Sequence, residues 1–386
     1  MVSIYDQVAP VIFGPGSIDQ MGEQLNALGC KVVMCVCDEG VKTAGITAKV
    51  ESRIIEAGVK CIVFAGVTSD PPASEIDEAV SLAREAKIDG VVGVGGGSSM
   101  DAAKAVALMT DRPGTIRDYL KEPPIQLESS IPIVMVPTTS GTGSEVTTTC
   151  VITYEEINKK CVVRAKPTLA IVDPELTKTC PPIISAYAGL DAFSQALESI
   201  TVKEEKRNPR SELMALASIE KTIKFLPRAC KDGSDTEART EMALASNWAG
   251  IAFADTSLHV GHAMTEVIGI NFHTLHGLNC AWVAPVVIEF VSQVDPEKLR
   301  LIGKSMGLDY GFDDPPAAIG EKTAKALRAF IKELGIKSPA EMGIDRDAFI
   351  GSSDSVLDMG LRHGSPVEIT TEIAKSLMTR TYDQWQ

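Results

Sequence analysis

The sequence places four of its five histidines in one stretch of eighteen residues, HVGHAMTEVIGINFHTLH. These four are His259, His262, His273 and His276. Neutral imidazole is the commonest metal ligand in proteins and the readiest general base near pH 7. The stretch has neither the cysteine pairs of a zinc finger nor the HExxH pattern of a zincin. It therefore predicts a metal or proton-transfer site, and the alternative is surface or core histidines that are merely close in sequence.

Two further pairs have the spacing that places side chains on one face of a helix. Asp191 and Gln195 are four residues apart, as are His262 and Glu266. Together with His276, Asp191 and His262 would give one carboxylate and two imidazoles, which suit Fe²⁺ or Zn²⁺ with positions open for substrate. The side chains expected to line the same cavity are Gln195, Glu266 and His273. Singly, Asp191 has an alternative as a helix cap, Gln195 as a polar core residue and Glu266 as part of a solvated helix face.

A glycine-rich segment follows an apolar run in the first half of the chain. The predicted strand Val91–Val94 leads into Gly95-Gly96-Gly97-Ser98-Ser99, and a predicted helix begins at once. Glycines let the backbone approach a ligand, and a helix N-terminus offers N–H groups to a phosphate. We expect Ser98 or Ser99 to cap this helix, with Asp101 in its first turn. The segment predicts a dinucleotide site, although it is not the GxGxxG pattern, and a tight turn without a ligand is the alternative.

Two other predicted strands also end in polar residues. Ile133–Val136 is followed by Pro137-Thr138-Thr139-Ser140-Gly141-Thr142-Gly143-Ser144-Glu145, whose hydroxyls and glycines suit phosphate, ribose or nicotinamide. Lys31–Cys37 is followed by Asp38. A carboxylate there accepts hydrogen bonds from a ribose 2′-hydroxyl and repels a 2′-phosphate. Asp38 therefore favours NAD over NADP, unless it only caps the next turn.

Alternating strands and helices must position these residues. The predicted strands are Lys31–Cys37, Cys61–Ala65, Val91–Val94, Ile133–Val136 and Leu169–Val172. The predicted helices are Ile18–Leu28, Thr47–Ala57, Ala73–Ala86 and Ser99–Met109. This alternation is typical of a mainly parallel sheet covered on both faces. Ligands of such sheets bind at the carboxyl ends of the strands, where the polar residues fall.

The second half of the chain is predicted to be all helical. Strand-like runs fade after Pro181-Pro182, and helical periodicity continues from about Ser185. We expect helix breaks at Pro209, Pro227, Asp232-Gly233, Pro285, Pro296 and Pro315-Pro316. The sequence therefore predicts an α/β NAD-binding domain over residues 1–180 and an all-α metal and substrate domain over residues 181–386.

Composition is that of a soluble globular protein, with 386 residues, 45% hydrophobic and 23% charged. We expect no membrane segment, because no apolar run reaches ~18–20 residues and the N-terminus lacks a signal-peptide core. The net charge of −14 argues against nucleic acid as a partner. Nine scattered cysteines indicate reduced thiols and a cytoplasmic protein. Cys35 and Cys37 alternate along a predicted strand and are expected to be small buried residues.

These residues together resemble the iron-containing (group III) alcohol dehydrogenases, the family of lactaldehyde reductase and 1,3-propanediol dehydrogenase. The resemblance covers nearly the whole chain and weakens after about residue 340. The segments that carry it are Phe13–Ser17, Gly95–Ser98 with Asp101 and Lys104, Pro137–Glu145, Asp173-Pro174, Gly189–Asp191 and His276-Gly277.

The resemblance implies a dehydroquinate synthase-like fold with NAD(P) between an α/β and a helical domain. By the family pattern Asp38 faces the adenosine ribose, and Gly96, Gly97 and Ser98 face the pyrophosphate. The other cofactor positions are Asp101, Thr138, Thr139, Thr147, Lys160 and Leu176. The metal ligands that carry over are Asp191, His262 and His276. The family also implies a homodimer or a larger homo-oligomer.

The sequence departs from the family pattern at two positions. The family's fourth metal ligand is a histidine four residues after the aspartate, and here it is Gln195. A second family histidine, near the substrate, is replaced by Glu266. The site either keeps Fe²⁺ or Zn²⁺ with help from Gln195 or Glu266, or has lost the metal as in the maleylacetate reductases. Replacing a residue that only contacts a ligand weakens metal binding by ~10-fold or more. We expect the loss of one imidazole ligand to weaken it at least as much.

The predicted function is reversible hydride transfer between NAD(H) and a small alcohol or its aldehyde or ketone. A metal ion would polarise the substrate oxygen, and His273 would pass the proton to solvent. Without metal, His262, His276 or Glu266 would supply acid–base catalysis, worth ~10²–10⁴-fold. The alternatives are a metal-independent reductase of the maleylacetate type, a lyase of the dehydroquinate synthase type and a non-catalytic nucleotide-binding protein.

Overall fold

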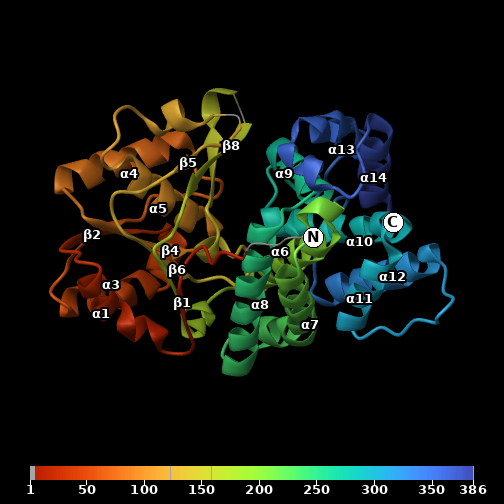
Figure 1. Ribbon diagram of the computed structural model, residues 1–386, viewed down its shortest axis with the longest axis horizontal. Helices are drawn as coiled ribbons and strands as arrows, with labels where there is room; N and C mark the ends of the chain where they lie inside the picture. The colour runs from red at the N-terminus through yellow and green to blue at the C-terminus, as the bar shows by residue number, and fades with distance from the viewer. Residues whose placement is uncertain (1–4, 122, 158, 386) are drawn as a thin grey trace. The chain divides into compact units, whose positions relative to one another are not determined.

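A six-stranded parallel sheet organises residues Gln7–Cys180 (Figure 1). Its strand order is β1-β9-β6-β4-β2-β3, and every neighbouring pair is parallel. The strands are β1 (Val11–Phe13), β2 (Val32–Val36), β3 (Lys60–Phe64), β4 (Gly90–Gly95), β6 (Ile133–Pro137) and β9 (Leu169–Val172). Five of the six were predicted, each to within one residue at either end. The computed structural model describes residues 5–121, 123–157 and 159–385.

Helices cover both faces of this sheet, as predicted (Figure 1). The helices on one face are α1 (Met21–Ala27) and α3 (Ile46–Glu56), and those on the other are α4 (Ala73–Ala86) and α5 (Gly97–Met109). In β2, Val33 and Cys35 belong to the core with α1 and α3, whereas Met34 and Val36 belong to the core with α4 and α5. Successive side chains of a strand point to opposite faces, so a continuous apolar run fits only a sheet buried on both sides. Cys35 and Cys37 are fully buried there, as expected.

A second, three-stranded sheet in the same unit was not predicted. Its order is β5-β8-β7, with β5 (Gln126–Leu127), β7 (Thr149–Tyr154) and β8 (Lys159–Ala165). The hairpin of β7 and β8 buries Cys150 and Ile152 but leaves alternate positions partly exposed. Polar residues at several of those positions, such as Thr149, Thr153 and Lys160, interrupt the apolar run by which the other strands were recognised. The predicted helix at residues 18–28 is also divided, into a 3₁₀ turn (Ser17–Gln20) and α1.

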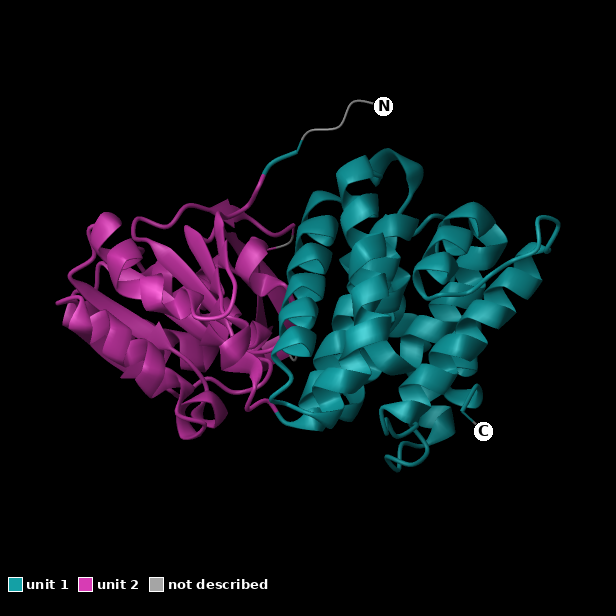
Figure 2. Cartoon of the chain, turned by 90° about the horizontal axis from the view of Figure 1, so that it is seen from below, with its two compact units in different colours: residues 1–6, 181–386 teal, residues 7–180 magenta. Residues whose placement is uncertain are grey.

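Pro181 begins a second unit that is entirely helical among its described residues (Figure 2). Its α-helices are α6 (Pro182–Thr201), α7 (Pro209–Lys231), α8 (Thr236–Asp255), α9 (Val260–Phe272), α10 (His276–Val294), α11 (Pro296–Ser305), α12 (Pro316–Glu333), α13 (Arg346–Gly351) and α14 (Thr371–Asp383). They share one apolar core that contains Phe193 and Trp282. Tyr5 and Asp6 group with this unit, and Arg210 donates to the Asp6 carbonyl at 3.0 Å.

Two of the predicted helix breaks are wrong. Pro209, Pro296 and Pro316 do stand at the first positions of helices. Pro227 instead lies inside α7, and Pro285 lies inside α10. An internal proline destabilises a helix by ~3 kcal/mol. Burial of a long apolar face stabilises the helix by more than that. Pro285 stands in such a face, a buried run from Leu278 to Ile288.

α10 is the one helix in the described part of the chain that is long and apolar enough to cross a membrane. Of its most apolar window, 72% is buried inside the unit. Its neighbours include α6, α9 and α12. This burial is typical of the central helix of a folded core.

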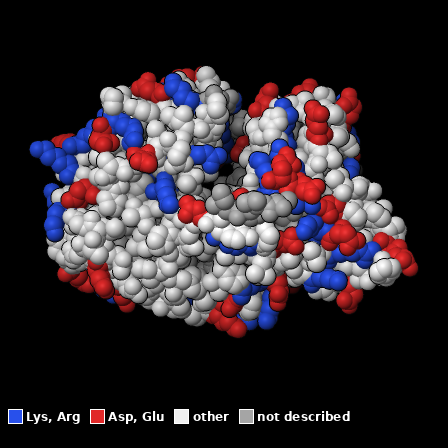
Figure 3. Space-filling view, viewed as in Figure 1, with Lys and Arg blue, Asp and Glu red and all other residues white. Residues whose placement is uncertain are grey.

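Charged side chains of both signs are interspersed on the face drawn in Figure 3. The chain carries 51 acidic and 37 basic residues, so acidic groups predominate. Many pair at the surface, as Arg228 does with Asp235 and Glu237. Such exposed pairs contribute only ~0–1 kcal/mol each, so the charge balance bears on solubility more than on the fold.

Candidate functional site

Helix α6 carries three polar side chains on one face in the second unit. Asp191, Gln195 and Glu198 are spaced four and then three residues apart, and all three are buried. Pro182 stands at the first turn of the helix, where its missing N–H is harmless. A buried carboxylate is costly unless other groups of the protein or a metal compensate its charge. The partners of Asp191 and Glu198 therefore define the site.

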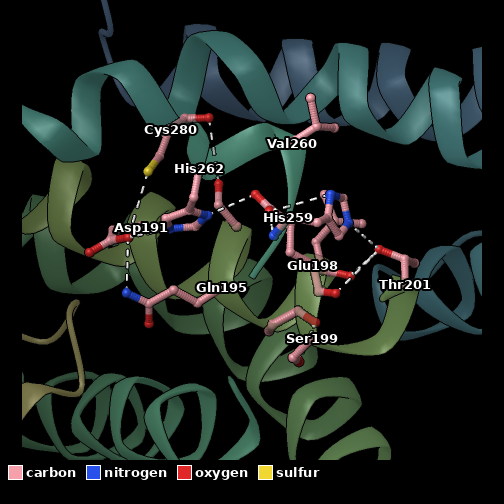
Figure 4. A network of polar contacts seen from close by, with 12 residues as sticks. Asp191, Gln195, Glu198, Ser199, Thr201, His259, Val260, His262 and Cys280 are labelled. Atoms are coloured by element: carbon pink, nitrogen blue, oxygen red, sulfur yellow. Dashed lines mark hydrogen bonds and ion pairs between the residues drawn. The ribbon is translucent and has the colours of Figure 1, made fainter. Parts of the chain in front are cut away.

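Helices α9 and α10 bring those partners to Asp191 (Figure 4). Nε2 of His262 and Nε2 of His276 each lie 3.5 Å from Asp191 Oδ1. The sulfur of Cys280, one turn after His276 on α10, lies 3.6 Å from the same oxygen. One ligand atom from each of these four residues lies within 4.8 Å of all the others. The structure thus brings together Asp191, His262 and His276, as the sequence predicted, and adds Cys280.

The spacing of these atoms fits a metal ion. Ligand bonds of ~2.0–2.3 Å at tetrahedral angles separate the ligand atoms by roughly 3.3–3.8 Å. The distances of 3.5 Å from each imidazole to Asp191 fall inside that range. Nε2 of His262 is buried and makes no hydrogen bond within the described chain. An imidazole nitrogen so placed, facing a carboxylate, is suited to zinc or ferrous iron.

The charges at this site stabilise one another. Burial alone would raise the pKa of Asp191, but the imidazoles of His276 and His262 hold it well below its ordinary value. Burial alone would lower the pKa of His276, but Cys280 and Asp191 raise it to about 10. The protons held on these imidazoles must leave before a metal ion can bind, because only the neutral ring is a ligand.

Glu198 orients His262 from the side away from Asp191. Its Oε1 accepts from His262 Nδ1 at 2.7 Å, and its Oε2 accepts from the backbone N–H of His259 at 2.6 Å. Burial opposes ionisation, yet the imidazoles of His262 and His259 lower the pKa of Glu198 to about 2. A carboxylate that accepts from Nδ1 fixes the ring and leaves Nε2 available as a metal ligand.

The other predicted residues of this unit are placed as follows. Gln195 donates from Nε2 to Asp191 Oδ1 at 3.0 Å. Glu266 is partly buried, one turn after His262 on α9. His273 is exposed and ends α9 with a left-handed φ of 51°. His259 is buried, with Nε2 2.9 Å from the hydroxyl of Thr201.

The glycine-rich segment of the first unit joins β4 to α5. Helix α5 starts at Gly97 and its N-cap is Gly96, which makes no side-chain cap hydrogen bond. The expected cap by Ser98 or Ser99 is therefore wrong: these residues already lie inside the helix, because it begins earlier than predicted. A Cβ added at Gly97 would lie 2.8 Å from Thr142 Cγ2, and one at Gly95, with φ of 152°, would lie 2.5 Å from Ser99 Oγ. An uncapped helix N-terminus approached by bare backbone fits a phosphate group.

Asp38 and Thr138 border this segment on the neighbouring strands. Asp38 follows β2, caps α2 (Glu39–Thr43) by accepting from Val41 N–H at 2.9 Å, and accepts from the Ser99 hydroxyl at 3.0 Å. The backbone N–H of Thr138 donates to Gly95 at 2.9 Å. Both cap and ligand interpretations of Asp38 stay compatible with this geometry, since carboxylate oxygens accept several hydrogen bonds.

The remaining predicted cofactor residues are all buried or partly buried. Asp101 is nearly buried and accepts from Ser144 Oγ at 2.7 Å and Val151 N–H at 3.0 Å. Lys160, on β8, forms an ion pair with Asp70 at 2.7 Å, and the Asp70 N–H donates to Ser98 Oγ at 3.3 Å. The other positions are Thr139, partly buried after β6, and Thr147 and Leu176, both buried.

Sequence reasoning missed Cys280, Glu198 and Asp70. Cys280 and His276 are four residues apart, and Glu198 and Asp191 are seven apart, so helical spacing alone could have linked each to a predicted ligand. Asp70 has a φ of 54°, a conformation that aspartate tolerates better than most residues. No pattern in the sequence indicates that conformation.

Comparisons with known proteins agree along most of the chain. The family model "Iron-containing alcohol dehydrogenase" matches residues 9–174, and "Fe-containing alcohol dehydrogenase family, C-terminal" matches residues 185–382. Choline dehydrogenase of Bacillus subtilis (strain 168) is 33% identical over 96% of this chain and 92% of its own. NAD-dependent methanol dehydrogenase of Bacillus methanolicus is 32% identical over 87% of this chain and 88% of its own. The crystal structure of a 1,3-propanediol oxidoreductase has a TM-score of 0.91 and 28% identity over 98% of this chain and 100% of that one.

Proposed function

The chain belongs to the iron-containing alcohol dehydrogenase family, and on that basis we propose that it is a metal-assisted, NAD-dependent dehydrogenase of small alcohols. It interconverts an alcohol and its aldehyde or ketone. In the oxidative direction the alcohol carbon gives a hydride to NAD⁺, the hydroxyl proton leaves, and a carbonyl compound and NADH result. The observation that carries the metal-assisted form is the convergence of His262 and His276 on Asp191 Oδ1 at 3.5 Å.

The residues proposed to hold the metal are Asp191, His262 and His276. The ion, when bound, would act as a Lewis acid on the substrate oxygen and lower the pKa of the alcohol. Gln195 keeps Asp191 in place through its 3.0 Å hydrogen bond, and Glu198 fixes the ring of His262. These two side chains keep the ligands oriented, which matters because small displacements of a reacting group cost large factors in rate.

The residues proposed to hold NAD are those at the strand ends of the first unit. The N-terminus of α5, at Gly96, Gly97 and Ser98, would bind the pyrophosphate through backbone N–H groups. Asp38 would accept from the adenosine ribose. The other contacts proposed are Thr138, Thr139, Thr147, Lys160 and Leu176. Asp101 accepts hydrogen bonds from Ser144 and Val151, which supports a role for Asp101 in holding the loop after β6 in position at this site.

The selection of NAD over NADP can be tested at Asp38. Replacing Asp38 by serine keeps a group able to cap α2 but removes the negative charge. We expect the ratio of kcat/KM with NADH to that with NADPH to fall by about 10-fold or more, because a 2′-phosphate is no longer repelled. Steady-state kinetics with both cofactors measures this ratio, and Asp19→Ser, at an exposed carboxylate of the same unit, is the control. An unchanged ratio would remove Asp38 from the cofactor site.

We propose that the proton reaches solvent through His273, with Glu266 near the start of its path. His273 is exposed and lies three residues before His276. Replacing His273 by alanine is expected to lower kcat by about 10²-fold, the lower limit for general acid–base catalysis, without changing metal content. His363→Ala, at another exposed histidine of the same unit, is the control. Equal values of kcat in the two variants would contradict the role of His273.

The dehydrogenase function is tested by following NADH in both directions of the reaction, each at a pH at which the equilibrium favours that direction. Alcohol oxidation would be assayed with methanol, ethanol, 1,3-propanediol and choline, and reduction with the corresponding aldehydes. We expect steady turnover with at least one pair after addition of Fe²⁺ or Zn²⁺. Turnover that needs no metal would favour the reductase alternative of the maleylacetate type. A single, tightly retained NAD without net NADH formation would favour the lyase alternative, and no turnover with any pair would contradict the proposal.

Two further proposals concern the cellular compartment and the oligomeric state. We propose that the protein acts in the cytoplasm, where its nine cysteines, all free thiols, would stay reduced. We also propose a homodimer or larger homo-oligomer, which sedimentation or light scattering of the purified protein would test. A strictly monomeric protein at micromolar concentration would contradict the second of these.

A further inference from the structure

Cys280 stands where the metal site lacks a ligand. The family pattern requires four side chains, and Gln195 occupies the position of the fourth. Cys280 is 1% exposed and its sulfur points to Asp191 (Figure 4). It belongs to the same cluster as the imidazoles of His262 and His276. We propose that Cys280, as a thiolate, supplies the fourth ligand of the metal ion. This inference rests on the proposed metal-assisted function.

The distances favour Cys280 as a ligand. Its Sγ lies 3.6 Å from Asp191 Oδ1, inside the range of roughly 3.3–3.8 Å expected between two ligands of one tetrahedral ion. It also lies within 4.8 Å of the ligand nitrogens of His262 and His276. Since Cys280 and His276 are four residues apart on α10, one rigid helix face presents both. The fold thus holds the sulfur beside the other three ligand atoms.

The contacts of Gln195 indicate a different role for that side chain. Its Nε2 lies 3.0 Å from Asp191 Oδ1, a hydrogen-bond distance and shorter than ligand-to-ligand spacing. With Nε2 donating to Asp191, only Oε1 of the Gln195 amide is left as a metal ligand, and an amide oxygen binds zinc or iron more weakly than a thiolate does. Gln195 therefore positions the carboxylate, and Cys280 takes the place of the missing imidazole.

The surroundings of Cys280 differ from those of an ordinary buried cysteine. Buried cysteines usually behave as small apolar residues, as Cys35 does in the sheet core. The sulfur of Cys280 instead faces one carboxylate and two imidazoles. Metal binding would replace the S–H bond by a sulfur–metal bond, with the proton released to solvent and no change of oxidation state. A thiolate is a soft ligand, so Cys280 shifts the preference of the site towards Zn²⁺ relative to Fe²⁺.

X-ray absorption at the zinc K-edge tests this inference without relying on activity. The full-length protein would be stripped of metal and reloaded with one equivalent of Zn²⁺. We expect one sulfur neighbour at ~2.3 Å beside nitrogen and oxygen neighbours at ~2.0–2.2 Å. Cys280→Ser should lose the sulfur neighbour and bind zinc about 10-fold more weakly or worse in competition with a chromophoric chelator. Cys230→Ser, at a partly buried cysteine of α7, should match the wild type.

The outcomes separate this inference from the function on which it rests. A zinc spectrum of the wild type with nitrogen and oxygen neighbours alone would overturn the role of Cys280 but leave a metal enzyme. A sulfur neighbour that persists in Cys280→Ser would overturn it as well. A wild-type protein that binds neither Zn²⁺ nor Fe²⁺ would overturn both the ligand assignment and the metal-assisted function. The wild-type spectrum is decisive even if the Cys280→Ser chain fails to fold.

Discussion

Replacing Asp191 by alanine is expected to abolish metal binding and to lower kcat/KM by about 10³-fold. Asp191 Oδ1 is the atom that His262, His276, Cys280 and Gln195 all face, at 3.0–3.6 Å. A Lewis-acid metal contributes several kcal/mol to the transition state, and each ~1.4 kcal/mol is tenfold in rate. Without the carboxylate the two imidazoles would also repel one another once protonated.

The test combines metal analysis with steady-state kinetics on Asp191→Ala and Asp191→Asn. The asparagine variant keeps the volume but offers only an amide oxygen, a weaker ligand, so its kcat/KM should fall between wild type and Asp191→Ala. Asp347→Ala, at a side chain that is 95% exposed in the same unit, is the matched control. Wild-type metal content in Asp191→Ala, or a loss of activity below tenfold, would mean that Asp191 is not a ligand.

Replacing Lys104 by methionine is expected to destabilise the first unit by ~3–5 kcal/mol, the usual cost of removing one partner of a buried ion pair. Lys104 is completely buried, and its ammonium donates to Ser144 Oγ at 2.7 Å, Thr149 O at 2.8 Å and Asp101 Oδ1 at 3.4 Å. Methionine keeps the length of the side chain but leaves the carboxylate of Asp101 without its counter-charge.

Thermal unfolding measures this effect. For a unit of this size ~1 kcal/mol shifts the midpoint by roughly 2–4 °C, so we expect the first unit to unfold roughly 6–20 °C lower. Adding Asp101→Asn to Lys104→Met should recover part of the loss, because the uncompensated charge disappears. Lys42→Met, at an exposed lysine paired with Glu39, should cost at most ~1 kcal/mol. A midpoint for Lys104→Met equal to that of Lys42→Met would contradict the role of the buried network.

The Lys104 network also bears on the cofactor site. It joins α5, which begins at the glycine-rich segment, to the 3₁₀ turn Ser144–Val146 and to β7. The two loops proposed to contact NAD are therefore held together from inside. A change in KM for NAD alongside the change in stability would follow from the same cause.

Five of the six strands of the parallel sheet could be predicted from sequence, because each is a short apolar run between helices. The three-residue strand β1 was too short to recognise. β7 and β8 could not be predicted, since their alternation of buried and polar residues resembles a loop until the hairpin partner is known. The predicted helix breaks at Pro227 and Pro285 were wrong for a related reason. A local rule predicts a break, but the burial that keeps α7 and α10 intact depends on helices distant in sequence.

The candidate metal site was predictable only in part. His262 and His276 stand out because four of the five histidines share one short stretch, and Asp191 joins them through the resemblance to the family. Cys280 is one of nine scattered cysteines, and in an apolar stretch it resembles a core residue. Glu198 resembles a solvated glutamate of a helix. Both acquire a role only through the packing of α9 and α10 around α6. The spacing of residues in the sequence does not predict this long-range packing.

The most direct test of the account is a metal titration of the stripped protein, followed through NADH formation from an alcohol substrate. The central claim is that Asp191, His262 and His276 hold an ion needed for turnover. We expect turnover to be negligible without metal, to rise with added Zn²⁺ or Fe²⁺ and to saturate at about one ion per chain, the stoichiometry of a single Lewis-acid site. Full turnover by the stripped protein, unchanged on addition of either ion, would contradict the claim and leave His262, His276 and Glu266 as acid–base residues of a metal-independent reductase.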